Sequence, residues 1–177
     1  MSASYTASTL PPMPTVSANG IALHYELSGV GPRLLVFNGS GGSIESLRPT
    51  LTYLTKHFEV LVHDQRGLGL TEVPEPPYAM ADYAADAAAL LDSVDWDTCA
   101  VIGISFGGMV AQEFAATYPE RVYRLALVCT SPGGSSPSFP LHELFDLPPE
   151  QRVERHLAAV DTRYTPEFLA SSPLDQM

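Results

Sequence analysis

The chain has 177 residues, of which 45% are hydrophobic, and this is enough to form one substantial buried core. Its formal net charge of −11 at pH 7 argues against nucleic acids and acidic membrane surfaces as partners. The sequence contains no CxxC pattern, no HExxH pattern and no phosphate-binding loop, so neither a metal nor a nucleotide cofactor is expected.

Residues 1–15 are rich in Ser, Thr and Pro and contain no Lys or Arg. They lack the charged start and the long apolar stretch that a signal peptide or a membrane span requires. We therefore expect a flexible tail at residues 1–15, no membrane partner and a cytoplasmic protein. Cys99 and Cys129 fall at strand edges without paired spacing, which predicts reduced core thiols in that compartment.

A hairpin opens the predicted fold. Asn19-Gly20 is a strong turn signal between the stretches 15–17 and 21–27, which are predicted as two paired strands. Residues 34–37 (Leu-Leu-Val-Phe) are a continuous apolar run, typical of a strand buried on both faces. This run leads into the glycine-rich segment 38–43 (Asn-Gly-Ser-Gly-Gly-Ser). Glycines there let the backbone approach a substrate closely and point N–H groups toward it.

Two helices and a strand are predicted next. Ser46 can cap a helix that runs to about residue 56, with Pro49 tolerated in its first turn. An apolar strand follows over 58–63. A second helix is predicted over 81–93, where alanines and a Leu-Leu pair supply the packing face.

A charged, glycine-rich turn at 64–71 (Asp-Gln-Arg-Gly-Leu-Gly-Leu-Thr) follows the strand that ends at His63. Asp64 and Arg66 can hold neighbouring loops by charge-assisted hydrogen bonds, while the two glycines permit unusual backbone angles. We therefore interpret this turn as structural and not as part of the catalytic machinery.

The most informative stretch is Gly103-Ile104-Ser105-Phe106-Gly107. It joins a predicted strand over 99–104 to a helix predicted to end at 118. A Gly-x-Ser-x-Gly pattern at such a junction is the nucleophile elbow of serine hydrolases. The tight turn needs small residues two positions before and two after the serine, and Gly103 and Gly107 meet this need. Ser105 is then expected to be exposed at a helix N-terminus, whose dipole favours developing negative charge.

Strands alternate with helices as far as the last predicted strand, 125–128 (Leu-Ala-Leu-Val). This alternation predicts an α/β fold with a doubly wound, mostly parallel sheet. After residue 134 the sequence changes in character. Residues 135–140 are interpreted as a linker, 149–160 as an amphipathic helix, and 165–167 as the start of a further helix.

Three motifs occur in the order found in one known family: Asn38-Gly39-Ser40, the turn 64–71, and the elbow around Ser105. Over residues 16–134 the chain resembles the α/β-hydrolase superfamily, most closely its small esterases, lactonases, carbon–carbon bond hydrolases and haloperoxidase-like members. That family usually has His in place of Asn38 and Ser in place of Thr71. The resemblance implies an α/β-hydrolase core at 16–134, and a linker with the beginning of a helical cap at 135–177.

The resemblance also implies a role for each motif residue. Ser105 is the nucleophile, which attacks the carbonyl of a small-molecule acyl substrate and forms an acyl-enzyme. The backbone N–H groups of Phe106 and Ser40 stabilise the tetrahedral oxyanion. Asn38 braces its loop. Gly39, Gly103 and Gly107 let the two loops pack closely.

In this superfamily the acid and the histidine follow the serine on loops after later strands. None of the five histidines fits that order: His24, His57, His63, His142 and His156. No carboxylate directly follows the strand 125–128 either. We therefore expect both residues beyond Met177, so that these residues form the N-terminal portion of a longer hydrolase and are inactive alone. The strand 125–128 is then an exposed apolar sheet edge that favours self-association.

A second class of function stays open at this point. The fold also suits a ligand-binding protein or an inactive homologue that uses the pocket without turnover. None of the motifs selects a substrate.

Overall fold

The computed structural model describes residues 14–134, 141–160 and 171. The chain divides into two compact units, residues 1–132 and 133–177. Of the predicted flexible tail at 1–15, residues 1–13 lie outside the described residues, whereas Thr15 already belongs to the first strand. The linker at 135–140 and the helix start at 165–167 also lie outside the described residues. In the part of the chain that is described, no helix is long and apolar enough to cross a membrane.

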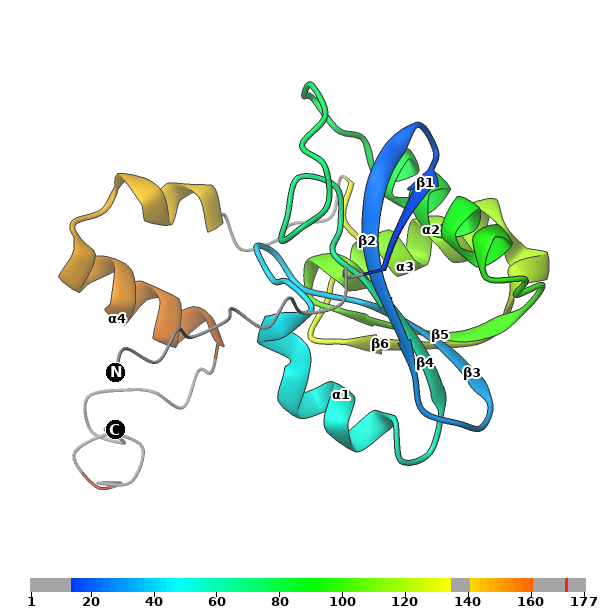
Figure 1. The fold of residues 1–177 in the computed structure, drawn as a ribbon. Coiled ribbons are helices and arrows are strands. Elements are labelled where there is room, and N and C mark those ends of the chain that lie inside the picture. The colour runs from blue at the N-terminus through cyan, green and yellow to red at the C-terminus, as the bar shows by residue number, and fades with distance from the viewer. Residues whose placement is uncertain (1–13, 135–140, 161–170, 172–177) are drawn as a thin grey trace, which may run out of the picture. The chain divides into compact units, whose positions relative to one another are not determined.

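The first unit is built on a six-stranded sheet with the order β1-β2-β4-β3-β5-β6 (Figure 1). Its strands are β1 (Thr15–Ala18), β2 (Ile21–Ser28), β3 (Arg33–Phe37), β4 (Glu59–His63), β5 (Cys99–Ile104) and β6 (Val122–Val128). Strands β4, β3, β5 and β6 are parallel, whereas β1 and β2 join antiparallel. The predicted α/β fold with a mostly parallel sheet is therefore confirmed.

Helices cover both faces of this sheet, as a doubly wound fold requires (Figure 1). The helices of the first unit are α1 (Arg48–Leu54), α2 (Met80–Ser93) and α3 (Phe106–Thr117). Leu34 and Val36 pack with α1 on one face, while Leu35 and Phe37 pack with α2 and α3 on the other. The apolar run in β3 is thus buried on both faces, as predicted.

The opening hairpin also forms as predicted. Ala18 pairs with Ile21, and the turn residues Asn19 and Gly20 have φ angles of 48° and 80°. A positive φ at both central residues of a two-residue turn is the geometry that Asn-Gly favours. The hairpin is anchored to α2, because Asn19 Nδ2 donates a hydrogen bond to Asp86 Oδ1 at 2.9 Å.

Two local predictions were wrong. Ser46 does not cap a helix: it lies in a 3-10 turn (Glu45–Leu47), and α1 begins after it. Its hydroxyl instead donates to Ser43 O at 2.7 Å within the preceding loop. Cys129 is not a core thiol, because it is exposed after β6, whereas Cys99 is buried.

Strand β6 lies at one end of the sheet, so one of its edges carries no neighbouring strand within the described residues. Its apolar side chains are open to solvent, with Leu125 40% and Leu127 44% exposed. The predicted exposed apolar edge is therefore present. Self-association through it stays a prediction.

The second unit contains α4 (Pro149–Val160), which has the bounds predicted from its amphipathic pattern, after a 3-10 turn (Leu141–Asp146).

In the first unit, the carboxyl ends of the four parallel strands lie along one edge of the sheet. Ligands of open α/β sheets bind outside this edge. The loops that follow β3, β4, β5 and β6 are therefore the ones to search for a site.

Candidate active site

Ser105 forms a strained turn between β5 and α3. Its φ of 53° and ψ of −119° lie in a region that residues with a side chain rarely adopt. Three hydrogen bonds to the backbone of Ser105 hold this conformation, two from or to other backbone groups and one from a side chain. Ser105 N donates to Val128 O at 2.8 Å, and its carbonyl oxygen accepts from Gly108 N at 2.8 Å and from Thr130 Oγ1 at 2.7 Å. Strain that is held this firmly is typical of functional sites.

The structure gives a steric reason for glycine on both sides of this turn. A Cβ on Gly103 would lie 2.4 Å from Gly107 O, and a Cβ on Gly107 would lie 2.3 Å from Asn38 O. Real Cβ atoms do not approach other atoms this closely, so a side chain at either position must push two backbone segments apart. Gly103 therefore lets α3 pack closely against β5, and Gly107 brings the elbow against the loop after β3.

That loop follows β3 with a tight turn at 39–42. Gly42 N donates to Gly39 O at 3.1 Å, and Gly41 has a φ of 67°. A positive φ at the third residue but not at the second defines a type II turn, with Ser40 in second position. A Cβ on Gly39 would lie 3.6 Å from Ser105 Cβ, so this turn lies directly beside the elbow.

Phe106 is the first residue of α3, and the N–H groups at the start of a helix have no partner within the helix. The N–H groups of Phe106 and Ser40 thus belong to two backbone segments that are packed against each other beside Ser105. This is the arrangement from which an oxyanion hole is built.

Asn38 braces the loop through its side chain. Its Oδ1 accepts from Gly39 N at 2.8 Å, and its Nδ2 donates to Ser43 O at 2.9 Å and to Ser46 Oγ at 3.3 Å. With its amide committed to the loop on both sides, Asn38 has a positional role. The family's usual histidine is thus replaced by a residue that holds the loop by its own hydrogen bonds.

The turn at 64–71 is structural, as interpreted from the sequence. The buried Asp64 carboxylate accepts from Ile44 N at 2.7 Å and from Leu70 N at 2.9 Å. Thr71 Oγ1 donates to Asp64 O at 2.7 Å and accepts from His24 N at 2.9 Å. Thr71 therefore makes the hydrogen bonds of a hydroxyl residue at a position where the family usually has serine.

Arg66 forms a buried ion pair with Asp86 on α2. Its Nε and Nη2 donate to the two carboxylate oxygens at 2.8 and 2.7 Å. These hydrogen bonds raise the pKa of Arg66 above its ordinary value, against the opposing effect of burial. Asp86 was not predicted from the sequence as the partner of Arg66. The sequence feature that could have revealed it is a single carboxylate on the apolar, alanine-rich face of α2. A charge buried on such a face requires a partner of opposite charge.

The histidines do not supply a base within the described residues. His63 is fully buried against Phe37, with ring centroids 5.7 Å apart, and burial lowers the pKa of its imidazole to about 4 despite nearby Asp86 and Asp64. Its Nδ1 has no hydrogen-bond partner in the described part of the chain. His24 Nδ1 pairs with Pro14 O at 3.1 Å.

The hydrogen bonds recorded at Ser105 in residues 14–134 use only its backbone, so its half-buried hydroxyl is not held by a histidine there. The side chains of His142 and His156 lie outside the described ones. Among its described side chains, the structure therefore brings together the predicted nucleophile and the two predicted donor segments, but not a base or an acid.

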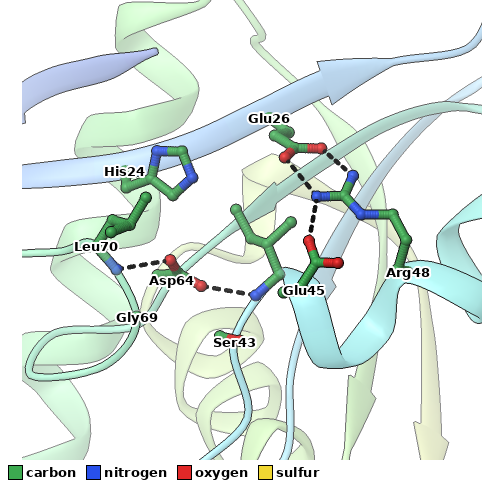
Figure 2. A pocket seen from close by; sticks show the side chains of 9 residues that line it. His24, Glu26, Ser43, Glu45, Arg48, Asp64, Gly69 and Leu70 are labelled. Atoms are coloured by element: carbon green, nitrogen blue, oxygen red, sulfur yellow. Dashed lines mark hydrogen bonds and ion pairs between the residues drawn. The ribbon is translucent and has the colours of Figure 1, made fainter. Parts of the chain in front are cut away.

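A pocket of about 240 Å³ lies between β2, the loop after β3 and the turn after β4, and its lining residues are drawn in Figure 2. Arg48 donates to both oxygens of Glu26, at 2.7 and 2.8 Å, and to Glu45 at 3.1 Å. The hydrogen bonds from Arg48 hold the pKa of the Glu26 carboxyl below its usual value. Because Ser105 does not line the pocket, we assign the pocket no part in the chemistry.

No group of three or more His, Cys, Asp or Glu side chains in the described ranges is arranged to hold a metal ion.

A serine on a strained strand-to-helix turn, at the carboxyl edge of a parallel sheet, defines the class of the α/β hydrolases. The sequence profile described as alpha/beta hydrolase fold matches residues 32–164. This is more than half of the chain, and the chain therefore belongs to the α/β hydrolase fold family.

Two curated proteins and one solved structure illustrate the similarity of the chain to known hydrolases. The chain is 40% identical over 100 residues to a poly(3-hydroxyalkanoate) depolymerase of Ectopseudomonas oleovorans, a match that covers 56% of this chain and 35% of the depolymerase. It is 28% identical to 3-oxoadipate enol-lactonase 2 of Acinetobacter baylyi, over 90% of this chain and 60% of the lactonase. The crystal structure of the enol-lactonase from Burkholderia xenovorans LB400 superposes with a TM-score of 0.69 and 27% identity, covering 91% of this chain and 64% of that one. The chain thus spans between about a third and three fifths of the length of these curated relatives.

Proposed function

We propose that the protein is a serine hydrolase that cleaves an ester, lactone or related acyl bond through an acyl-enzyme on Ser105. The observation that carries this proposal is the strained conformation of Ser105. Three hydrogen bonds to its backbone hold this conformation, and none to its hydroxyl occurs within residues 14–134. Relatives named as a depolymerase and an enol-lactonase support the reaction class.

In the proposed mechanism, Ser105 Oγ forms a bond to the acyl carbon while its proton passes to a general base. The electron pair of the carbonyl moves to its oxygen, and the N–H groups of Phe106 and Ser40 stabilise this oxyanion. The intermediate then re-forms the carbonyl and expels the alcohol oxygen, which takes the proton back. Water hydrolyses the acyl-enzyme by the same sequence of steps.

We propose that the general base is a histidine other than the five in residues 1–177, because in this family the histidine follows the serine on a loop after a later strand. An unassisted serine hydroxyl is a weak nucleophile, so residues 1–177 alone are expected to show no triad-dependent turnover. A direct comparison is p-nitrophenyl butyrate hydrolysis by residues 1–177 and by the product of the complete reading frame. Equal turnover by both would contradict this assignment of the base.

The function itself is tested on the product of the complete reading frame with a panel of p-nitrophenyl esters and lactones. Saturable hydrolysis of any member supports the proposal. The alternative, a ligand-binding protein without turnover, is favoured by the lack of a histidine at Ser105 among the described side chains. Saturable binding of these compounds without hydrolysis would favour that alternative.

Replacing Ser40 by proline is expected to lower kcat by ~10²–10³-fold, because proline lacks the N–H that stabilises the oxyanion. The second position of a type II turn favours proline, so the turn at 39–42 should keep its shape and its stability. The matched variant Ser40→Ala changes the same side chain but retains the N–H. Steady-state kinetics and thermal unfolding of both variants check this. Equal kcat values for the two variants would show that Ser40 is not a donor.

A further inference from the structure

Gln65 follows β4 and lies buried below the loop that carries Ser40, with 1% of its surface exposed. Its Nε2 donates a hydrogen bond to Asn38 O at 2.8 Å, across 27 positions of sequence. A backbone carbonyl oxygen only accepts hydrogen bonds, so the amide nitrogen, and not the amide oxygen, must face Asn38. The direction of this side chain is therefore fixed by chemistry.

The Asn38 carbonyl is held from a second side as well. A Cβ on Gly107 would lie 2.3 Å from the same oxygen, so the first turn of α3 packs directly against it. This oxygen is thus confined between the Gln65 amide and the elbow. This carbonyl belongs to the peptide between Asn38 and Gly39, and the next peptide carries the Ser40 N–H. A change in the orientation of the first peptide therefore shifts the Ser40 N–H relative to the Phe106 N–H.

The rest of the Gln65 amide is poorly satisfied. Gln65 Oε1 is buried without a hydrogen-bond partner in the described part of the chain, and so is Nδ1 of His63, two residues earlier. A buried polar atom without a partner costs stability, and an apolar side chain of similar size avoids that cost. Packing alone therefore does not explain a glutamine here. Polar groups that reduce stability in this way are typical of functional sites.

We propose that Gln65 is a positioning residue for the oxyanion hole, acting through the Asn38 carbonyl on the Ser40 N–H. This inference rests on the proposed hydrolase function. It adds a side chain from the turn after β4, a turn we otherwise interpret as structural, to the support of the transition state. Gln65 itself does not touch the substrate.

The test uses Gln65→Leu in the product of the complete reading frame, with p-nitrophenyl butyrate as substrate. Leucine has similar length but cannot donate a hydrogen bond to Asn38 O. Because the Ser40 N–H is displaced and not deleted, kcat is expected to fall by ~10–100-fold, less than for loss of a donor, while KM stays unchanged. The matched control is Thr55→Val, which removes a side-chain hydrogen bond of 2.9 Å to a backbone carbonyl at the end of α1. This control should leave kcat and KM unchanged, because α1 packs on the opposite face of the sheet from α3.

A second measurement separates positioning from a general loss of structure. A phenylalkyl trifluoromethyl ketone forms a tetrahedral oxyanion with an active serine, whereas the corresponding methyl ketone stays planar. Gln65→Leu is expected to weaken the binding of the trifluoromethyl ketone by ~10-fold or more and to leave the affinity for the methyl ketone unchanged. If Gln65→Leu does not fold, Gln65→Met, with its adaptable side chain, replaces it.

Unchanged kcat and unchanged trifluoromethyl ketone affinity in a folded variant would overturn the proposal. An equal loss of affinity for both ketones would also overturn it, because it would indicate a general packing defect. Failure of the proposed function is seen separately, as a wild-type protein that hydrolyses no ester at all.

Discussion

Replacing Ser105 by alanine is expected to lower kcat for ester hydrolysis by at least ~10⁴-fold in the product of the complete reading frame. The reason is that the nucleophile, and with it the acyl-enzyme, is lost, and the remaining rate comes from binding and the oxyanion hole alone. Alanine occupies the same backbone conformation, so the strain at this position and the fold should change little. Steady-state kinetics with p-nitrophenyl butyrate measure the effect.

Ser93→Ala is the matched control. Ser93 lies at the end of α2, where its hydroxyl donates to Leu90 O at 2.7 Å, and it has no part in the proposed chemistry. This variant should retain wild-type kcat. A Ser105→Ala protein that keeps more than about a tenth of wild-type activity would be incompatible with a serine mechanism.

The largest effect on stability is expected for Asp86→Ala, with a loss of about 3–5 kcal/mol in the free energy of unfolding. The variant leaves the Arg66 guanidinium buried without its partner, and a buried unpaired charge is strongly unfavourable. It also removes the acceptor for Asn19 Nδ2. Asp86 therefore connects the hairpin turn, the turn after β4 and α2.

Glu26→Ala provides the comparison, because Glu26 also accepts two hydrogen bonds from one arginine, Arg48. The Arg48 side chain is 43% exposed, against 9% for Arg66, so loss of this pair should cost only about 0–1 kcal/mol. Urea denaturation measures both variants. Similar losses in the free energy of unfolding for Asp86→Ala and Glu26→Ala would show that burial does not increase the contribution of the Arg66 ion pair to stability. The double variant Arg66→Met with Asp86→Leu should recover most of the lost stability.

The parts of the fold that were predicted from sequence are those encoded by local patterns. The apolar run 34–37 identified β3, and Asn19-Gly20 identified the hairpin, because burial on two faces and a positive φ each leave a short signature. The elbow was recognisable for the same reason. Its turn allows only glycine at positions 103 and 107, which lie within five residues of sequence. The structure shows the close contacts that exclude a larger residue there.

The parts that were missed depend on contacts between distant residues. Asp86 and Gln65 act on partners 20 and 27 positions away, and nothing in their immediate neighbours specifies those partners. Ser46 was misassigned as a helix cap because its hydroxyl is taken by Ser43 in the loop. Cys129 was misassigned to the core because its exposure depends on the position of β6 at the end of the sheet.

The central claim is that Ser105 is an activated nucleophile, and covalent labelling tests it most directly. The product of the complete reading frame is treated with a fluorophosphonate probe, digested and mapped by mass spectrometry. We predict one adduct, on the peptide that contains Ser105, and none on that peptide in the Ser105→Ala variant. A folded protein that carries no adduct on Ser105, or reacts at another residue instead, would contradict the account.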